Sequence, residues 1–282
     1  MPKRILASCV VLCGFALLAA SASGQDQPIS YTISVGSDKA SYDDETKVSA
    51  GGEDIGGRAT IRINGNPVAF HQSAGKFLTI NQMLKPGENT LSFDGKFAKN
   101  LYVKVLRIQG NNLLDVVAKK EIAADGTGAA RELTFRADLA WTPPFYKDSP
   151  KVEDTAETRD GIWQALDQFQ KDVAAGHAEE AAARIFEGPR IWLVKCFGAT
   201  PEALAQMIDQ QKSWAESIRK TLKPLAKDDL KFEFGPNAVM VWAGVEAPPL
   251  CPAYSFTLNQ DGQVTHLPHL IFVRLGGKWT VW

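Results

Sequence analysis

The sequence has few of the motifs that indicate a particular catalytic chemistry. It contains no Gly-rich phosphate loop, no nucleophile elbow, no metalloprotease helix and no paired-cysteine motif. Only four histidines occur in the 282 residues. These absences leave no sequence basis for phosphate binding, nucleophilic hydrolysis or zinc chemistry, and they favour a protein that is not an enzyme.

An excess of charge of one sign is also missing. The chain has 31 Lys and Arg residues against 32 Asp and Glu residues. Removing an N-terminal segment that carries Lys3, Arg4 and no acid leaves 29 basic and 32 acidic residues, a net charge of −3. Nucleic-acid-binding domains present a basic patch or stripe. We therefore expect no nucleic-acid partner.

Long apolar runs are missing except near the N-terminus. The basic segment Pro2–Arg4 precedes an apolar run, Ile5–Ala20, and the small residues Ala20–Gly24 follow it. This order is typical of a secretory signal peptide, whereas a membrane helix needs about 20 apolar residues. We expect residues 1–24 to be cleaved and the protein to be exported, either periplasmic or secreted, with no membrane span after cleavage.

Cysteine is scarce outside that segment. Cys9 and Cys13 lie within residues 1–24, so Cys196 and Cys251 remain. A pair of cysteines in an exported chain suggests a disulfide, and closing a loop of about 55 residues would stabilise the fold by about 4 kcal/mol. We predict a Cys196–Cys251 disulfide, with two buried free thiols as the alternative.

Residues 28–138 have the pattern of strands almost throughout. Alternation with period two, or a run of β-formers, marks Tyr31–Val35, Ala59–Ile63, Thr90–Phe93, Leu101–Ile108, Leu113–Ile122 and Glu132–Ala137. Turn residues occur at Asn64–Pro67 and Pro86–Asn89. About seven or eight short strands at this spacing predict an all-β sandwich domain.

The turns carry a resemblance as well. The segments Ile61–Val68 and Leu84–Leu91 resemble bacterial immunoglobulin-like and jelly-roll domains, in which an Asn-Gly turn precedes a strand and a leucine followed by Pro-Gly-Glu-Asn leads into the next one. The resemblance implies an immunoglobulin-like or jelly-roll β-sandwich for residues 28–138. It also leaves an envelope interaction module, acting through this sandwich, as one alternative function.

A proline-rich segment, residues 139–155, separates this region from the next. Its aromatic stretch Trp141–Tyr146 contains two prolines, and a third follows in Asp148–Pro150. Proline removes a backbone donor and excludes helix interiors and central strands. We predict a semi-rigid linker whose aromatic residues pack against one of the two domains.

The second region, residues 156–282, begins with helical patterns. Apolar residues recur at helical spacing over Ile162–Val173, and a glycine after them suits a helix end. The segment His177–Phe186 predicts a second helix, which Gly188-Pro189 should end, and Arg190–Phe197 fits either a strand or a short helix. Thr200-Pro201-Glu202 then has the capping residues of a third helix.

Strand patterns follow these helices. The expected strands are Leu230–Phe234, Val239–Trp242, a strand from Tyr254, a long strand after an Asp261-Gly262 turn, and a final strand after a Gly276-Gly277 turn. Helices followed by an antiparallel sheet predict an α+β domain with its helices on one face.

The order of these elements is similar to that of the nuclear-transport-factor-2-like superfamily. The matching parts are Ile162–Phe186 and Phe256–Trp282, centred on Gly277-Lys278-Trp279. The superfamily includes ketosteroid-isomerase-like proteins, scytalone dehydratase and polyketide-cyclase (SnoaL-like) proteins. The resemblance implies a cone-shaped domain in which helices pack on a curved antiparallel sheet around a pocket, used for a small apolar ligand, for acid–base chemistry or only for dimer packing.

Aromatic and titratable residues are the candidates for such a pocket. Aromatic side chains either fill the core or line an apolar pocket, and the candidate lining residues are Trp163, Phe169, Trp192, Trp214, Trp242, Phe256 and Phe272. The catalytic candidates are Tyr254, His266 and His269. On one strand, two histidines three positions apart point to opposite faces. We therefore expect no metal site and no cofactor.

Together these patterns predict an exported, non-catalytic two-domain protein. It would bind a small apolar ligand or a protein partner through its conical second domain, and a homodimer through the C-terminal sheet is a further option. An isomerase, dehydratase or cyclase that uses the same pocket is the alternative.

Overall fold

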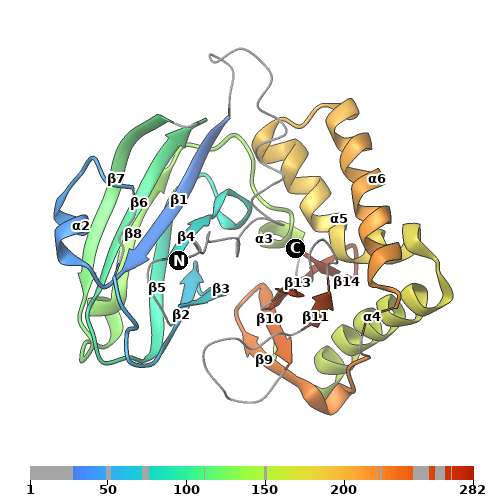
Figure 1. The fold of residues 1–282 in the computed structure, drawn as a ribbon. Helices are drawn as coiled ribbons and strands as arrows, with labels where there is room; N and C mark the ends of the chain where they lie inside the picture. The colour runs from blue at the N-terminus through green and yellow to red at the C-terminus, as the bar shows by residue number, and fades with distance from the viewer. Residues whose placement is uncertain are drawn as a thin grey trace, which may run out of the picture.

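The computed structural model describes residues 28–48, 52–71, 76–110, 112–148, 151–220, 222, 224–243, 254–257, 264–267 and 269–282. The predicted signal peptide, Cys251 and the Asp261-Gly262 turn lie outside these residues. In Figure 1 the strands of the first half lie on one side of the molecule and the long helices lie on the other.

Two antiparallel sheets make up the first half. Their strands are β1 (Ile29–Gly36), β2 (Arg58–Ile63), β3 (Asn66–His71), β4 (Lys76–Thr79), β5 (Gly87–Lys96), β6 (Leu101–Gln109), β7 (Asn112–Ile122) and β8 (Glu132–Ala137). The sheet orders are β4-β1-β6-β7 and β3-β2-β5-β8. Short helices are interspersed: α2 (Lys39–Asp43), η2 (Asn81–Met83) and η3 (Gly128–Arg131). The predicted strands are confirmed.

Alternation of side chains explains how these sheets share a core. In β8 exposed and buried residues alternate strictly, because successive side chains of a strand point to opposite faces. Inward residues of both sheets, such as Ile33 and Val103 of one and Ile61 and Phe93 of the other, belong to one cluster and are completely buried. The two sheets therefore enclose a common apolar core.

The predicted turn at Asn64-Gly65 joins β2 to β3. Asn64 has φ 51° and Gly65 has φ 80°, so both central residues adopt the left-handed conformation that a type I′ hairpin turn requires. Asparagine and glycine are the residues that reach this conformation at least cost, which is why the sequence pattern identified this turn.

A buried lysine holds α2 against the first sheet. Lys104 of β6 is 0% exposed, and its Nζ donates hydrogen bonds to the carbonyl oxygens of Ser41 (2.7 Å), Asp44 (2.6 Å) and Lys47 (3.1 Å). Burial lowers the pKa of this ammonium group below its usual value. All three donor positions of the ammonium are therefore satisfied by one loop.

The proline-rich segment contains a helical turn, contrary to the prediction that it excludes helix. α3 (Phe145–Asp148) begins directly after Pro143-Pro144, where proline is tolerated because the first helical N–H groups need no partner. Phe145 is 0% exposed and its ring lies 5.2 Å from that of Trp282. Tyr146 donates from its hydroxyl to the Met83 carbonyl at 2.6 Å. This segment is packed into the molecule.

Three long helices begin the second half: α4 (Ala156–Ala175), α5 (Ala178–Phe197) and α6 (Pro201–Ile218). The hydroxyls of Thr155 and Thr200 cap the N-termini of α4 and α6 by accepting from backbone N–H groups. α4 ends at Gly176, as the sequence predicted.

α5 differs from the prediction that Gly188-Pro189 ends a helix. It continues to Phe197 and contains both residues, although an interior proline removes a backbone hydrogen bond and costs about 3 kcal/mol. Both residues are buried, and a Cβ at Gly188 would lie 2.3 Å from the carbonyl oxygen of Val281. The close approach of the helix to a strand explains why packing overrides local preference here.

A four-stranded antiparallel sheet completes the second half. Its strands are β9 (Leu230–Phe234), β10 (Ala238–Ala243), β13 (Leu270–Leu275) and β14 (Lys278–Val281), in the order β14-β13-β10-β9, and η4 (Lys227–Asp229) precedes it. The predicted long strand is divided. Among the described residues, β12 (Val264–Leu267) pairs with β11 (Tyr254–Thr257) in a separate two-stranded sheet. The hairpin at Gly276-Gly277 is confirmed.

The inner strands of this terminal sheet, β10 and β13, have buried side chains on both faces. Val239 and Phe272 face the helices and share a core with Leu166 of α4 and Ile185 of α5. Residues that face the other way, Ala238, Val273 and the adjacent Trp282, belong instead to the core of the first half. The sheet therefore forms the middle layer between the long helices and the first two sheets.

Two turns and one arginine connect the halves at their edge. Asn66 accepts at its Oδ1 from the backbone N–H of Asn237 at 2.8 Å. Arg62 donates to the Phe234 carbonyl at 2.9 Å and forms ion pairs with Asp94 and Glu233. The Arg62 side chain is 14% exposed, so solvent screens these contacts only partly.

The chain thus adopts a sheet-rich α+β fold, in which the described residues form three four-stranded antiparallel sheets, one two-stranded sheet and helices. Within the described ranges, no helix combines the length and the apolar composition that crossing a bilayer requires.

Candidate functional site

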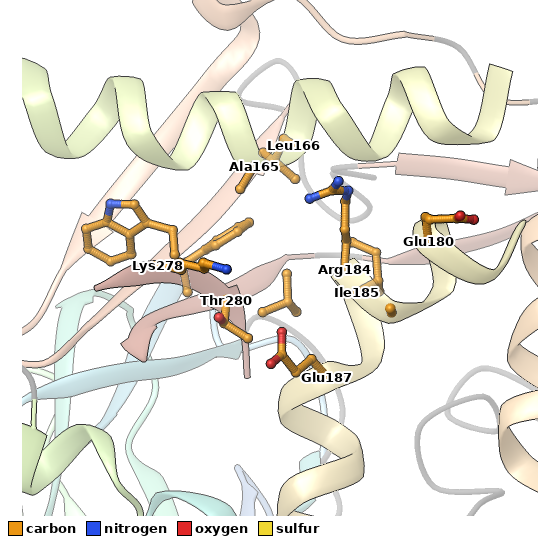
Figure 2. A pocket seen from close by; sticks show the side chains of 12 residues that line it. Ala165, Leu166, Glu180, Arg184, Ile185, Glu187, Lys278 and Thr280 are labelled. Carbon is orange, nitrogen blue, oxygen red and sulfur yellow. The ribbon is translucent and has the colours of Figure 1, made fainter. Parts of the chain in front are cut away.

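A pocket of about 300 Å³ lies where α4, α5 and the β13–β14 hairpin meet (Figure 2). Its lining residues are Ala165, Leu166, Glu180, Ala183, Arg184, Ile185, Glu187, Phe272, Lys278, Trp279, Thr280 and Val281. This volume is at the lower end of the range for small-molecule sites.

The floor of the pocket is apolar and belongs to the core of the second half. Leu166, Ile185, Phe272 and Val281 are between 1% and 6% exposed and are members of the same buried cluster. They come from a helix, a second helix and two strands, so the floor is held by elements that pack against one another. A rigid apolar floor can receive the hydrophobic part of a small molecule.

The charged lining residues lie mainly on α5. Glu180, Arg184 and Glu187 are spaced i, i+4 and i+7, which places them on one face of the helix. Lys278 begins β14 on the opposite wall. The pocket therefore presents both signs of charge above its apolar floor.

A buried carboxylate fixes the position of Arg184. Asp172 of α4 is 5% exposed and accepts from Nε of Arg184 and from the Gln168 side-chain amide, the latter at 2.8 Å. The Asp172 carboxylate offsets the charge of Arg184 at short range. Within the described residues, Lys278, Glu180 and Glu187 have no such ion-pair partner, although the charge of Arg190 interacts with that of Glu187 along α5.

Lys278 and Glu187 face the same space from opposite walls. Figure 2 shows the Lys278 amine and the Glu187 carboxylate on either side of Thr280, whereas Glu180 points away from them. Among the described residues, neither Lys278 nor Glu187 forms an ion pair. Both groups can therefore reach a molecule that occupies the pocket.

Most of the aromatic residues predicted to line a pocket pack elsewhere in the structure, and Phe272 is the exception. Phe272 lines the pocket. Phe169 stacks on Trp214 at 6.3 Å between ring centroids, Trp192 contacts Phe197 at 5.7 Å, and Trp242 receives the Arg58 guanidinium over its ring at 5.6 Å. Trp163 packs against the core of the second half. The side chain of Phe256 lies outside the described residues.

Of the predicted catalytic candidates, His269 has a described side chain, and it does not line this pocket. Tyr254 lies on β11 and His266 on β12, and the side chains of both fall outside what the structure describes. Nε2 of His269 donates to the Val68 carbonyl at 3.1 Å, which is a contact between the two halves of the chain. His269 thus takes part in packing the terminal sheet against β3.

The predicted disulfide partner Cys251 lies outside the described residues, so the pairing stays a prediction. Cys196 lies near the end of α5 and forms no disulfide with another described residue. Burial raises the pKa of this thiol to about 12. In the part of the chain that is described, no group of three or more His, Cys, Asp or Glu side chains is arranged to hold a metal ion.

The sequence analysis missed the polar half of this site. Charged residues on a helix are usually exposed to solvent, so Glu180, Arg184 and Glu187 do not stand out in the sequence. Their i, i+4, i+7 spacing, next to the inward-facing Ile185, was the signal that could have placed them beside the sheet.

No family model, no curated protein and no solved structure matches the chain.

Proposed function

We propose that this chain is an exported, non-catalytic binding protein that holds a small, partly apolar molecule in the pocket between α4, α5 and β14. The observation that supports this function is the combination of a preformed apolar floor with charged groups at its edge. Small-molecule sites have this composition, with apolar walls for affinity and a few polar groups for orientation.

We further propose an immunoglobulin-like or jelly-roll sandwich for residues 28–138 and a cone-shaped, nuclear-transport-factor-2-like domain for residues 156–282. Two sheets around one core support the first assignment. The second is supported by α4 and α5 lying on a sheet that ends in the Gly276-Gly277 hairpin, with a pocket between helices and sheet.

Binding is favoured over catalysis by the separation of the charged groups. General acid–base catalysis needs titratable groups within hydrogen-bond reach of the same reacting atoms. The four charged lining residues form no ion pair with one another. Separated charges of this kind orient a bound molecule without forming a coupled acid–base pair.

The proposal is tested by filling the pocket. Ala183→Leu adds a larger apolar side chain to the pocket wall, and Ala205→Leu makes the same change at an exposed position of α6. In a fragment screen by ligand-observed NMR, we expect fragments that bind the wild type and Ala205→Leu but not Ala183→Leu, with equal melting temperatures. The absence of any binder, or binders that are retained in Ala183→Leu, would contradict the function.

A further inference from the structure

The charges around the pocket indicate which class of ligand it binds. This inference about the ligand rests on the proposed function. Arg184 is already paired with the buried Asp172. Lys278 offers a positive charge from β14, and Glu187 offers a negative charge from α5 across the same space (Figure 2). A ligand that lies between them meets one charge of each sign, with apolar side chains below.

A ligand with a single charge would form a favourable contact with only one of the two side chains, Lys278 or Glu187. An anion would be attracted by Lys278 and repelled by Glu187, and a cation would experience the reverse. A molecule that carries an ammonium group and a carboxylate close together, with an apolar substituent, matches both walls and the floor formed by Leu166, Phe272 and Val281.

We propose that the pocket binds a small zwitterion of the α-amino-acid type. Its carboxylate contacts the Lys278 ammonium, its ammonium group contacts the Glu187 carboxylate, and its apolar side chain lies on the floor. The floor supplies affinity through buried apolar area. The two exposed charges supply discrimination, because ion pairs at exposed positions are individually weak.

The test compares three probes that differ by one charged group. L-Leucine carries both charges, 4-methylpentanoate lacks the ammonium group, and isopentylamine lacks the carboxylate. By isothermal titration calorimetry on the purified chain, we expect L-leucine to bind up to about fivefold more tightly than either singly charged probe, which is the range that one added exposed charged contact provides.

Two variants test which side chain contacts which charged group of the ligand. Lys278→Met should weaken L-leucine and 4-methylpentanoate and tighten isopentylamine, because it removes a positive charge that repels the amine. Glu187→Gln should weaken L-leucine and isopentylamine and tighten 4-methylpentanoate, because it removes a negative charge that repels the carboxylate. The controls Lys195→Met on α5 and Glu216→Gln on α6 remove the same charges from exposed positions outside the pocket. They should behave as the wild type.

The possible outcomes distinguish a failure of the zwitterion inference from a failure of the proposed binding function. Equal binding of all three probes, or the tightest binding by a singly charged one, overturns the zwitterion and leaves a binding pocket. If none of the three binds while fragments still bind in a manner sensitive to Ala183→Leu, only the ligand class is wrong. If fragments fail as well, both proposals fail.

Discussion

At the scale of single residues, Lys104 joins α2 to the first sheet. Replacing it with methionine keeps most of the apolar stem but leaves three carbonyl oxygens without their donor. Unsatisfied buried acceptors cost about 1–3 kcal/mol each, and the loop can turn some of them to water. We expect Lys104→Met to lower the free energy of unfolding by about 3 kcal/mol in urea denaturation. The exposed Lys119→Met serves as the control, with a loss below about 1 kcal/mol.

The contribution of Lys104 to stability should depend on pH in a definite direction. Because burial lowers its pKa in the folded state, the unfolded chain, with a pKa of about 10.4, binds this proton more tightly. The contribution of Lys104 to the free energy of unfolding is therefore largest above the pKa of the unfolded chain. It is lost as the pH falls through the pKa of the folded state. The stability difference between wild type and Lys104→Met should therefore grow as pH rises toward about 10.4. Urea titrations at several pH values measure it, and a shrinking difference would contradict the lowered pKa.

Cys196 gives a prediction that also decides its pairing. A thiol with a pKa of about 12 has roughly a thousandfold less thiolate at pH 8 than an ordinary cysteine. We expect iodoacetamide to label Cys196 of the native chain correspondingly slowly, with fast labelling in urea, as followed by mass spectrometry. Rapid native labelling would contradict the burial. Failure to label in urea without a reductant would instead establish the predicted bond to Cys251.

At the scale of elements, α5 depends on its contact with β14. Gly188→Ala would improve helix propensity by about 1 kcal/mol, but its Cβ would collide with backbone atoms of Val281 and Trp282. We expect a net loss of about 2 kcal/mol or more and a shifted tryptophan fluorescence maximum from the displaced strand. Gly126→Ala, whose nearest neighbour would be 3.2 Å away, is the control. A stabilised Gly188→Ala chain would show that the approach is not close.

Local sequence patterns predicted most helices and strands. They did not predict where an element ends when tertiary packing sets that end. Period-two alternation located β5, β6 and β8, and capping residues located the start of α6. The Gly188-Pro189 pair has the local signature of a helix end, and only its burial against β14 explains why the helix continues. Such contacts join residues far apart in the sequence, so a local pattern cannot contain them.

The candidate site was predictable only in part for a similar reason. Leu166, Ile185 and Phe272 have apolar periodicity and were expected to face inward. The aromatic residues were poor guides, because large rings at helical spacing fill the core: Phe169 and Trp214 stack on each other. Lys278 becomes part of the site only because the β13–β14 hairpin brings it opposite α5.

At the scale of the whole molecule, the inner strands of the terminal sheet, β10 and β13, already pack on both faces within the chain. Ala238 and Val273 are 0% exposed and pack into the core of the first half. The predicted homodimer through the C-terminal sheet would have to displace this packing. The first half of the same chain packs on the sheet face that includes Ala238 and Val273, which such a homodimer would need.

This shared core predicts that the two halves unfold together. We expect one calorimetric transition for the wild type, because residues of the terminal sheet complete both clusters. Arg62→Met removes contacts to Glu233 and to the Phe234 carbonyl, and should cost about 2 kcal/mol. The double variant with Glu233→Gln should cost less than the sum of the two single variants. Two resolved transitions in the wild type would refute the joint core.

The position of the terminal sheet has a consequence for biosynthesis. A chain that emerges N-terminus first, from a ribosome or through a translocation channel, presents β1–β8 long before β13 and β14 are made. During that interval the apolar patch later covered by Ala238, Val273 and Trp282 stays open to water and to other chains. Early domains with such exposed surface are prone to aggregate, so a holding chaperone that shields this patch would raise the yield of folded protein.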